Sequence, residues 1–139
     1  MIISDDPEAI RRVLIGSKTI AVVGCSNKPD RDSYQIAESL IERGFDVIPV
    51  NPGATEILGR KCYPDVKSIP RKVDIVDVFR APEHIPPIAD DAIAAKAECL
   101  WLQSGIVSSE AERLAHEAGI DFVQNRCLMV EHMHQGRAR

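Results

Sequence analysis

The sequence predicts a three-layer α/β fold, in which helices cover both faces of a parallel sheet of about five strands. Short apolar runs rich in β-branched residues recur along the chain, and longer segments with apolar residues at helical spacing separate them. The chain has 139 residues and is 45% hydrophobic, which is enough to bury one core. Strands that alternate with helices pair in parallel through right-handed crossovers. We therefore predict one Rossmann-like, doubly wound domain over residues 1–139, with the strand order 3-2-1-4-5.

The first half of the chain predicts two helices and two strands. A helix is expected around Pro7–Ile15. Thr19–Gly24 follows as a buried strand, because its β-branched run has no polar alternation. Ser33–Arg43 has apolar residues at helical spacing and predicts a second helix. Asp46–Asn51 is the second strand, where Pro49 indicates an early end or an irregularity.

The second half continues the alternation. Val73–Phe79 is the third strand, a helix is expected at Pro86–Ala97, and Glu98–Gln103 is the fourth strand. Ser108–Ala118 predicts a helix that opens with a capping-box-like segment, and Ile120–Gln124 gives a short fifth strand. We expect the remaining residues to form at most a helical turn before a polar tail.

Composition excludes several classes of function. The formal net charge of −4 argues against nucleic-acid binding, because affinity for the phosphate backbone comes mainly from clustered Lys and Arg. The first residues lack the pattern of a signal peptide, and no apolar stretch approaches the roughly 20 residues that span a bilayer. The four cysteines, at positions 25, 62, 99 and 127, form no CxxC pair. We therefore expect a cytoplasmic protein with free thiols and no membrane partner.

The loop after the first strand is the first candidate for a ligand site. In a doubly wound sheet the ligand lies beyond the carboxyl ends of the strands, where the strand order reverses. For the predicted order this crevice lies between the first and fourth strands. The loop offers a glycine for a tight turn, polar donors, two cations and backbone N–H groups at a helix start, which together suit a pyrophosphate. These residues are Gly24, Ser26, Asn27, Lys28, Arg31 and Ser33.

Three features of the sequence bear on which nucleotide could bind. The dinucleotide fingerprint GxGxxG is absent, since only Gly24 matches it. An NAD site also needs an acidic residue at the end of the second strand to hold the ribose, and Asn51–Gly53 stands there instead. No GxxxxGK[ST] segment is present either. NADP stays open as an alternative, because Lys28 and Arg31 suit a 2′-phosphate.

Five segments in order resemble the small stand-alone CoA-binding domain proteins, which are similar to the CoA-binding domain of the succinyl-CoA synthetase alpha subunit. They are VVGCSNKPDRDSY, VIPVNPG, LGRKCYPDV, VDIVDVFR and WLQSGI. The resemblance runs from about Ile15 to Cys127. It implies coenzyme A or an acyl-CoA as the ligand, and a Rossmann-type fold.

The resemblance also implies roles for residues at the ends of four strands. In the loop after the first strand, the phosphates would be held near Gly24, Cys25, Ser26, Asn27, Lys28, Arg31, Ser33 and Tyr34. The adenosine end would be flanked by Asn51 and Pro52, and the nucleotide would be covered by Phe79 and Arg80. The pantetheine path would be lined by Leu102, Gln103, Ser104 and Gly105.

The chain departs from the synthetase in two respects. The ligase loop is richer in glycine than Ser26–Pro29, so the phosphate geometry is expected to differ in detail. The synthetase's phosphorylated histidine lies in a second domain that these 139 residues do not include. We therefore expect a binding module without catalysis of its own, and leave open a small oxidoreductase or acyl-transfer protein that uses NAD(P) or an acyl-CoA. A homodimer or a protein partner is left open too.

Two cysteines invite a redox interpretation. Cys25 lies in the ligand loop beside a helix N-terminus, which lowers thiol pKa values, so it is a candidate redox thiol or a partner for a mixed disulfide with coenzyme A. The sequence favours a packing role for Cys25, because buried free cysteines are common. Cys127 has no visible resolving partner, and we expect even less function there.

The remaining candidates are expected to be structural. His132 and His134 lie in the expected polar tail without further metal ligands, and His84 is expected to cap a helix or face solvent. Asp74 and Asp77 are expected to face the less buried side of the third strand or to pair locally. Trp101 and Val107 are expected in the core, and Phe79 stays open between core packing and contact with adenine.

Overall fold

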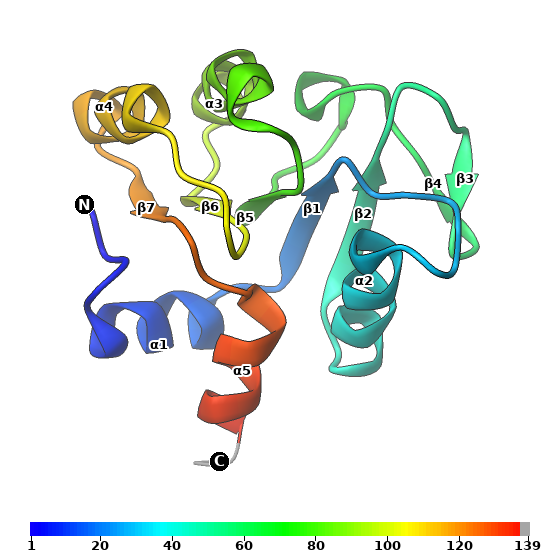
Figure 1. Cartoon of the computed structure of the whole chain (residues 1–139), viewed down its shortest axis with the longest axis horizontal. Coiled ribbons are helices and arrows are strands. Elements are labelled where there is room, and N and C mark those ends of the chain that lie inside the picture. Colours follow the sequence, from blue (N-terminus) through cyan, green and yellow to red (C-terminus); the bar gives the residue numbers. More distant parts are fainter. Residues whose placement is uncertain (137–139) are drawn as a thin grey trace.

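The computed structural model describes residues 1–136, in which five parallel strands form a central sheet (Figure 1). The strands are β1 (Thr19–Val23), β2 (Asp46–Val50), β5 (Ile75–Val78), β6 (Cys99–Leu102) and β7 (Asp121–Val123). A small antiparallel hairpin, β3 (Glu56–Ile57) and β4 (Arg60–Lys61), lies outside this sheet. The α/β fold with a parallel sheet of five strands is confirmed.

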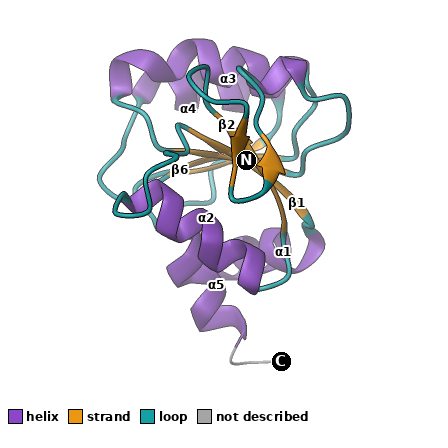
Figure 2. Cartoon of the chain, turned by 90° about the vertical axis from the view of Figure 1, so that its right-hand side faces the viewer, coloured by secondary structure: helices purple, strands orange, loops and turns teal. Residues whose placement is uncertain are grey.

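Helices cover both faces of the sheet, which gives the three layers seen edge-on in Figure 2. One face carries α1 (Pro7–Gly16), α2 (Asp32–Glu42) and α5 (Leu128–Gly136). The other carries α3 (Ile85–Ala94) and α4 (Ser109–Ala118). Two short 3-10 turns complete the elements, at Val66–Ser68 and Pro82–His84. Because both faces are covered, every residue of β1, β5 and β6 is buried, as the apolar runs predicted.

The predicted strand order 3-2-1-4-5 is wrong, because the observed order is β2-β1-β5-β6-β7. The third strand of the sheet along the chain, β5, pairs with β1 instead of extending the sheet beyond β2. The connection from β2 to β5 carries the β3–β4 hairpin and a 3-10 turn in place of a crossover α-helix. The order therefore reverses between β1 and β5, and the crevice expected between the first and fourth strands lies between the first and third.

Two element ends differ from the prediction for local reasons. β2 runs through Pro49 to Val50 instead of ending early, and it is an edge strand of the sheet, where a missing N–H is tolerated. The helix expected to reach Ala97 ends at Ala94, and Lys96 adopts a left-handed backbone with φ of +59°.

Trp101 and Val107 were both predicted in the core, and only Trp101 lies there. Trp101 is fully buried as predicted, and its Nε1 donates to the Arg126 carbonyl at 2.7 Å. Val107 is 52% exposed, so its placement in the core is wrong. Asp77 is 0% exposed and neither carboxylate oxygen has a hydrogen-bond partner within residues 1–136, which contradicts the expected half-buried or paired position. Burial raises the pKa of Asp77 well above its ordinary value. Asp74 does pair with groups close to it in space, because its carboxylate accepts the backbone N–H groups of Lys18 and Thr19.

The chain after β7 forms the helix α5, whereas the sequence predicted at most one helical turn before a polar tail. His132 of α5 is 5% exposed and packs edge-to-face on Phe45, with ring centroids 4.8 Å apart. His134 is exposed. The last three residues of the expected tail lie outside the described residues. Within residues 1–136, no cluster of three His, Cys, Asp or Glu side chains is placed to hold a metal ion, and no helix is long and apolar enough to cross a membrane.

Candidate functional site

The end of β1 approaches the end of β5 so closely that only glycine fits there. Gly24 has φ of +83°, and a β-carbon at this position would lie 2.7 Å from the Phe79 carbonyl oxygen and 2.8 Å from Arg80 Cδ. Gly24 N–H donates to the Val50 carbonyl at 2.9 Å, so the turn also stays attached to β2. The carboxyl ends of β1, β2 and β5 therefore meet at Gly24.

The loop from Gly24 to α2 is folded by its own hydroxyl groups. Ser33 Oγ accepts the Ser26 backbone N–H at 2.9 Å, and Ser26 Oγ accepts the Lys28 N–H at 3.0 Å. Arg31 N–H donates to the Lys28 carbonyl at 3.1 Å. The prediction that the loop leaves its backbone N–H groups free is therefore wrong for Ser26, Lys28 and Arg31.

The start of α2, like that of α3, lacks the side-chain cap that α1 and α4 have. Asp6 caps α1 through the Ala9 N–H, and Ser108 caps α4 through the Ala111 N–H, as the capping segment predicted. The N-cap of α2 is Arg31, which provides no side-chain hydrogen bond. A helix start without a side-chain cap leaves donors and partial positive charge for a bound anion.

Asn51 holds two loops together at this edge. Its Nδ2 donates to the Cys25 carbonyl at 2.9 Å, and its Oδ1 accepts the Gly53 N–H at 2.8 Å. These bonds occupy the side-chain amide with the protein's own backbone. Asn51 is thus positioned to fix the site geometry, whereas the exposed Pro52 beside it lines a hollow.

Three adjoining hollows lie at the carboxyl edge of the sheet. The loop hollow, of about 400 Å³, is lined by Gly24, Ser26, Asp30, Arg31, Asp32, Ser33 and Phe79. The β2-side hollow, of about 100 Å³, is lined by apolar residues that include Val23, Val50, Pro52 and Val66, by Gly24 and Arg80, and by the carboxylates of Asp65 and Asp91. The α5-side hollow, of about 470 Å³, is lined chiefly by Ile36, Phe79, Arg80, Gln103, Ile106 and Cys127. Each pair of hollows shares at least one residue, so they surround Gly24, Phe79 and Arg80.

The cations around these hollows have no partners. Lys28, Arg31 and Arg80 form no ion pair and no side-chain hydrogen bond with the rest of residues 1–136. Arg31 lines the loop hollow, and Arg80 lines both other hollows. Lys28 is exposed in the loop between β1 and α2. Two carboxylates, Asp30 and Asp32, also line the loop hollow. An anion in the loop hollow would therefore face Arg31, which is free to pair with it, and also the carboxylates of Asp30 and Asp32.

The predicted site residues fall into three groups. Nine line the hollows: Gly24, Ser26, Arg31, Ser33, Pro52, Phe79, Arg80, Gln103 and Ser104. Three are exposed at the same edge outside the hollow walls: Asn27, Lys28 and Gly105. The side chains of four others are used by the protein itself, namely Cys25, Tyr34, Asn51 and Leu102.

Two of these predictions are wrong for the side chain. Cys25 and Leu102 are both 0% exposed, so neither side chain can contact a ligand at the surface. Leu102 points into the core beneath α3 and α4, while Cys25 packs in the core on the opposite face of the sheet. Burial, with a smaller contribution from Cys62, raises the pKa of Cys25 to about 12. This contradicts the alternative of a redox thiol at Cys25, because the reactive form of cysteine is the thiolate.

Part of the α5-side hollow was not predicted from the sequence. Ile36, Ile106 and Cys127 line it although none was expected there. Cys127 reaches the hollow because the chain crosses the carboxyl edge after β7 and enters α5, where the Leu128 N–H donates to Gln103 Oε1 at 3.0 Å. If the last residues had been predicted to form a helix, Cys127 would have been placed at this edge.

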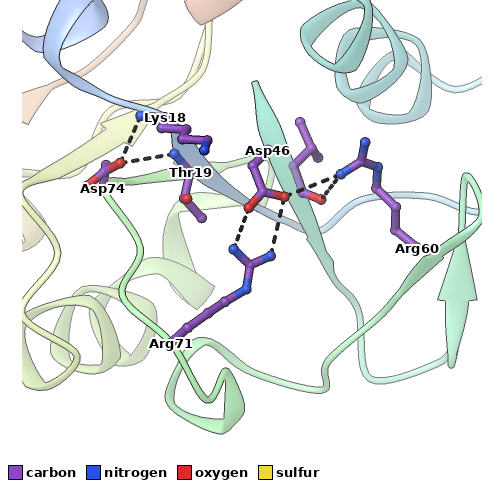
Figure 3. A network of polar contacts seen from close by, with 7 residues as sticks. Lys18, Thr19, Asp46, Arg60, Arg71 and Asp74 are labelled. Carbon is purple, nitrogen blue, oxygen red and sulfur yellow. Dashed lines mark hydrogen bonds and ion pairs between the residues drawn. The ribbon is translucent and has the colours of Figure 1, made fainter. Parts of the chain in front are cut away.

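At the opposite, amino-terminal edge of the sheet, several charges near the strand starts are paired (Figure 3). Asp46 accepts from Arg71 and lies 3.4 Å from Arg60, and Asp74 accepts two backbone N–H groups at the start of β1. Lys72 pairs with Glu98 at 2.6 Å. A hollow of about 310 Å³ lies at this edge, between α1 and the strand starts, and its lining combines Arg12, which has no ion pair within residues 1–136, with the carboxylates of Asp74, Glu98 and Asp121.

Comparison with known families gives one match over most of the chain. Residues 18–133 match the family described as "CoA binding domain". A curated relative from Bacillus subtilis, the uncharacterized protein YneT, is 38% identical over 88% of this chain and 91% of its own. The ADP-forming acetate–CoA ligase II of Archaeoglobus fulgidus is 30% identical over 73% of this chain, which spans only 16% of the ligase.

Solved structures agree in fold. A hypothetical protein from Pyrococcus horikoshii is 44% identical, with a TM-score of 0.90 over 93% of this chain and 91% of its own. A protein from Thermus thermophilus is 37% identical, with a TM-score of 0.89 over 94% of this chain and 98% of its own. A dinucleotide-forming acetyl-coenzyme A synthetase from Candidatus Korarchaeum cryptofilum, in complex with phosphate and ADP, is 30% identical, with a TM-score of 0.67 over 78% of this chain and 26% of its own.

Proposed function

This chain belongs to the CoA binding domain family, and on that premise we propose that it binds coenzyme A, free or acylated, at the carboxyl edge of its sheet. The observation that carries the proposal is the group of unpaired cations, Lys28, Arg31 and Arg80, around adjoining hollows. Coenzyme A carries a pyrophosphate and a 3′-phosphate, and charge-assisted hydrogen bonds from Arg and Lys are the strong way to hold phosphates.

The three hollows suggest an arrangement for the ligand. We place the pyrophosphate in the loop hollow, at the uncapped start of α2 and next to Arg31. The adenosine end would lie toward Pro52 in the β2-side hollow. Arg80 would stand between this end and the α5-side hollow, because it lines both of these hollows. The pantetheine arm would follow the α5-side hollow, past Phe79 and Gln103. Phe79 lines two of the hollows, which supports a ligand contact for it.

We propose a binding module without catalysis of its own, acting as a carrier, sensor or partner of another protein. The ligase relatives contain this domain as a small part of a much longer chain, so their reaction is not carried over. We further expect the protein to work in the cytoplasm, where the free cysteines of the described residues would remain reduced.

Calorimetric titration with coenzyme A, dephospho-CoA, NADPH and NAD tests the proposal. We expect coenzyme A to bind, and dephospho-CoA to bind more weakly because it lacks the 3′-phosphate that a cation would contact. Binding of NADPH without binding of coenzyme A would overturn the proposal and favour a small NADP-dependent oxidoreductase. Absence of heat with all four ligands, confirmed by unchanged melting temperatures, would overturn it as well.

A further inference from the structure

The α5-side hollow contains a cysteine that binding of the nucleotide does not use. Cys127 lines this hollow immediately before α5, and its side chain is partly exposed. The other three thiols, of Cys25, Cys62 and Cys99, are buried, and burial raises the pKa of each. Buried thiols of this kind are unreactive. Cys127 is therefore the thiol in the described part of the chain that a dissolved disulfide can reach.

A second feature of the same hollow indicates a ligand. Gln103 lines the hollow and is only 4% exposed. Its Oε1 accepts the Leu128 N–H at 3.0 Å, which fixes the orientation of the amide and leaves Nε2 for the hollow. Nε2 donates to no group within residues 1–136 and is not fully buried, so it is open to a molecule in the hollow. An unused N–H donor in the wall of a hollow suits a carbonyl oxygen of a bound molecule.

We propose that the thiol end of coenzyme A enters the α5-side hollow and forms a reversible mixed disulfide with Cys127. This inference rests on the proposed function, because the nucleotide must be held nearby. The pantetheine arm has two amide carbonyls that can accept from Gln103, and it ends in a thiol. Ile36 and Ile106 give the hollow apolar walls for the methylene groups of the arm.

The reaction requires coenzyme A in its disulfide form as the co-reactant. The Cys127 thiolate attacks one sulfur of CoA–S–S–CoA, forming a new S–S bond while the original one breaks. The second coenzyme A leaves as a thiolate and takes up the proton that Cys127 released. Cys127 and one coenzyme A are then joined as a disulfide, and the other coenzyme A is the reduced product. Attack by a dissolved thiol on the mixed disulfide reverses the reaction.

Intact-mass analysis under non-reducing conditions tests the inference. The full chain is incubated with coenzyme A disulfide and, separately, with pantethine, which has the same disulfide and arms but no nucleotide. We expect a single adduct that peptide mapping places on Cys127 and that the Cys127→Ser variant lacks. The rate with coenzyme A disulfide should exceed that with pantethine by about tenfold or more, because a bound nucleotide raises the local concentration of the disulfide.

Equal rates with the two reagents, an adduct on another cysteine, or no adduct would overturn the inference. Calorimetry of reduced coenzyme A on the wild-type chain separates the two proposals. Binding of reduced coenzyme A without a nucleotide-dependent adduct refutes only the mixed disulfide. Absence of that binding refutes the proposed function as well.

Discussion

The two edges of the sheet differ in how their charged residues are used. At the amino-terminal edge, Asp46 is held by Arg60 and Arg71 (Figure 3), and Lys72 is held by Glu98, while Arg12 has no ion pair within residues 1–136. At the carboxyl edge, Arg31 and Arg80 have no partner within residues 1–136 and stand beside hollows. Both edges have a hollow of several hundred Å³, so the presence of a hollow does not distinguish them.

We infer from this difference that the carboxyl edge is the one prepared for a ligand. A paired cation must lose its partner before it can bind an anion, whereas an unpaired one gains a partner on binding. The amino-terminal edge therefore contributes to folding, and the carboxyl edge is the candidate for recognition. The strand order agrees, because the order reverses between β1 and β5, and ligands of open α/β sheets bind at the carboxyl ends of strands at such a point.

The largest expected effect is at the contact between the ends of β1 and β5. Gly24→Ala should destabilise the protein by about 3 kcal/mol or more, because it combines a left-handed backbone with a clash against the Phe79 carbonyl and Arg80. Urea denaturation measures this. The control is Gly119→Ala, where φ is +75° and the β-carbon would meet no atom within 4 Å. The control should cost only about 1–2 kcal/mol. Equal losses would show that the close approach has no energetic role.

Next in size is the effect of the unpaired cations on ligand affinity. Arg31→Ala and Arg80→Ala should each weaken coenzyme A binding by about 1.5–3 kcal/mol, through loss of a charge-assisted hydrogen bond to phosphate. The matched control is Arg71→Ala, at the paired edge, which should leave the affinity unchanged. Calorimetry gives all three values. If Arg71→Ala weakens binding as much as the other two, the assignment of the edges is wrong.

Between the two edges, Asp77 introduces a dependence of stability on pH. Burial raises the pKa of Asp77 in the folded protein. The contribution of its neutral carboxyl to stability is fully present below the pKa of the unfolded chain, about 3.9. This contribution is lost as the pH rises toward the higher pKa of the folded protein. Asp77→Asn should therefore be more stable than wild type at pH 7, by up to about 1.4 kcal/mol for each unit by which burial raises the pKa of Asp77. The two proteins should converge near pH 3–4. A constant difference across this range, measured by thermal denaturation, would contradict a buried neutral carboxyl.

The smallest effect is expected at the paired edge itself. A hydrogen bond from Arg71 lowers the pKa of Asp46, so the pair stabilises the fold above the unfolded pKa of about 3.9, and this contribution is lost as the pH falls. The pair is partly exposed, so Arg71→Ala should cost only about 0.2–1 kcal/mol at neutral pH. Urea titrations at neutral and acidic pH should show the difference disappearing in acid. A difference that persists in acid would rule out the charge interaction as its cause.

Local patterns were sufficient to predict most elements. The buried run of β1 and the cap at Ser108 were predicted because each depends on neighbouring residues. Gly24 could be singled out because it follows a buried strand at a place where parallel sheets turn into helices.

Features that depend on distant segments could not be predicted in this way. The pairing of β5 with β1 joins residues 55 positions apart, Ile20 and Ile75, and no local pattern indicates which neighbour a parallel strand selects. The same limit explains Leu102 and Cys127, whose exposure depends on which helix covers them. Asp77 was misplaced because its carboxylate suggests exposure, while central strands of a doubly covered sheet have no exposed face.

Mapping of coenzyme A by two-dimensional NMR on the labelled protein tests the central claim most directly. On titration, backbone amide shifts should concentrate at Gly24–Ser33, Phe79–Ala81 and Gln103–Ser104, at the carboxyl edge. The amides of Arg71–Asp74, at the paired edge, should stay unchanged and serve as the internal control. Shifts centred on Arg71–Asp74, with none at the loop after β1, would contradict the claim that unpaired cations mark the binding edge.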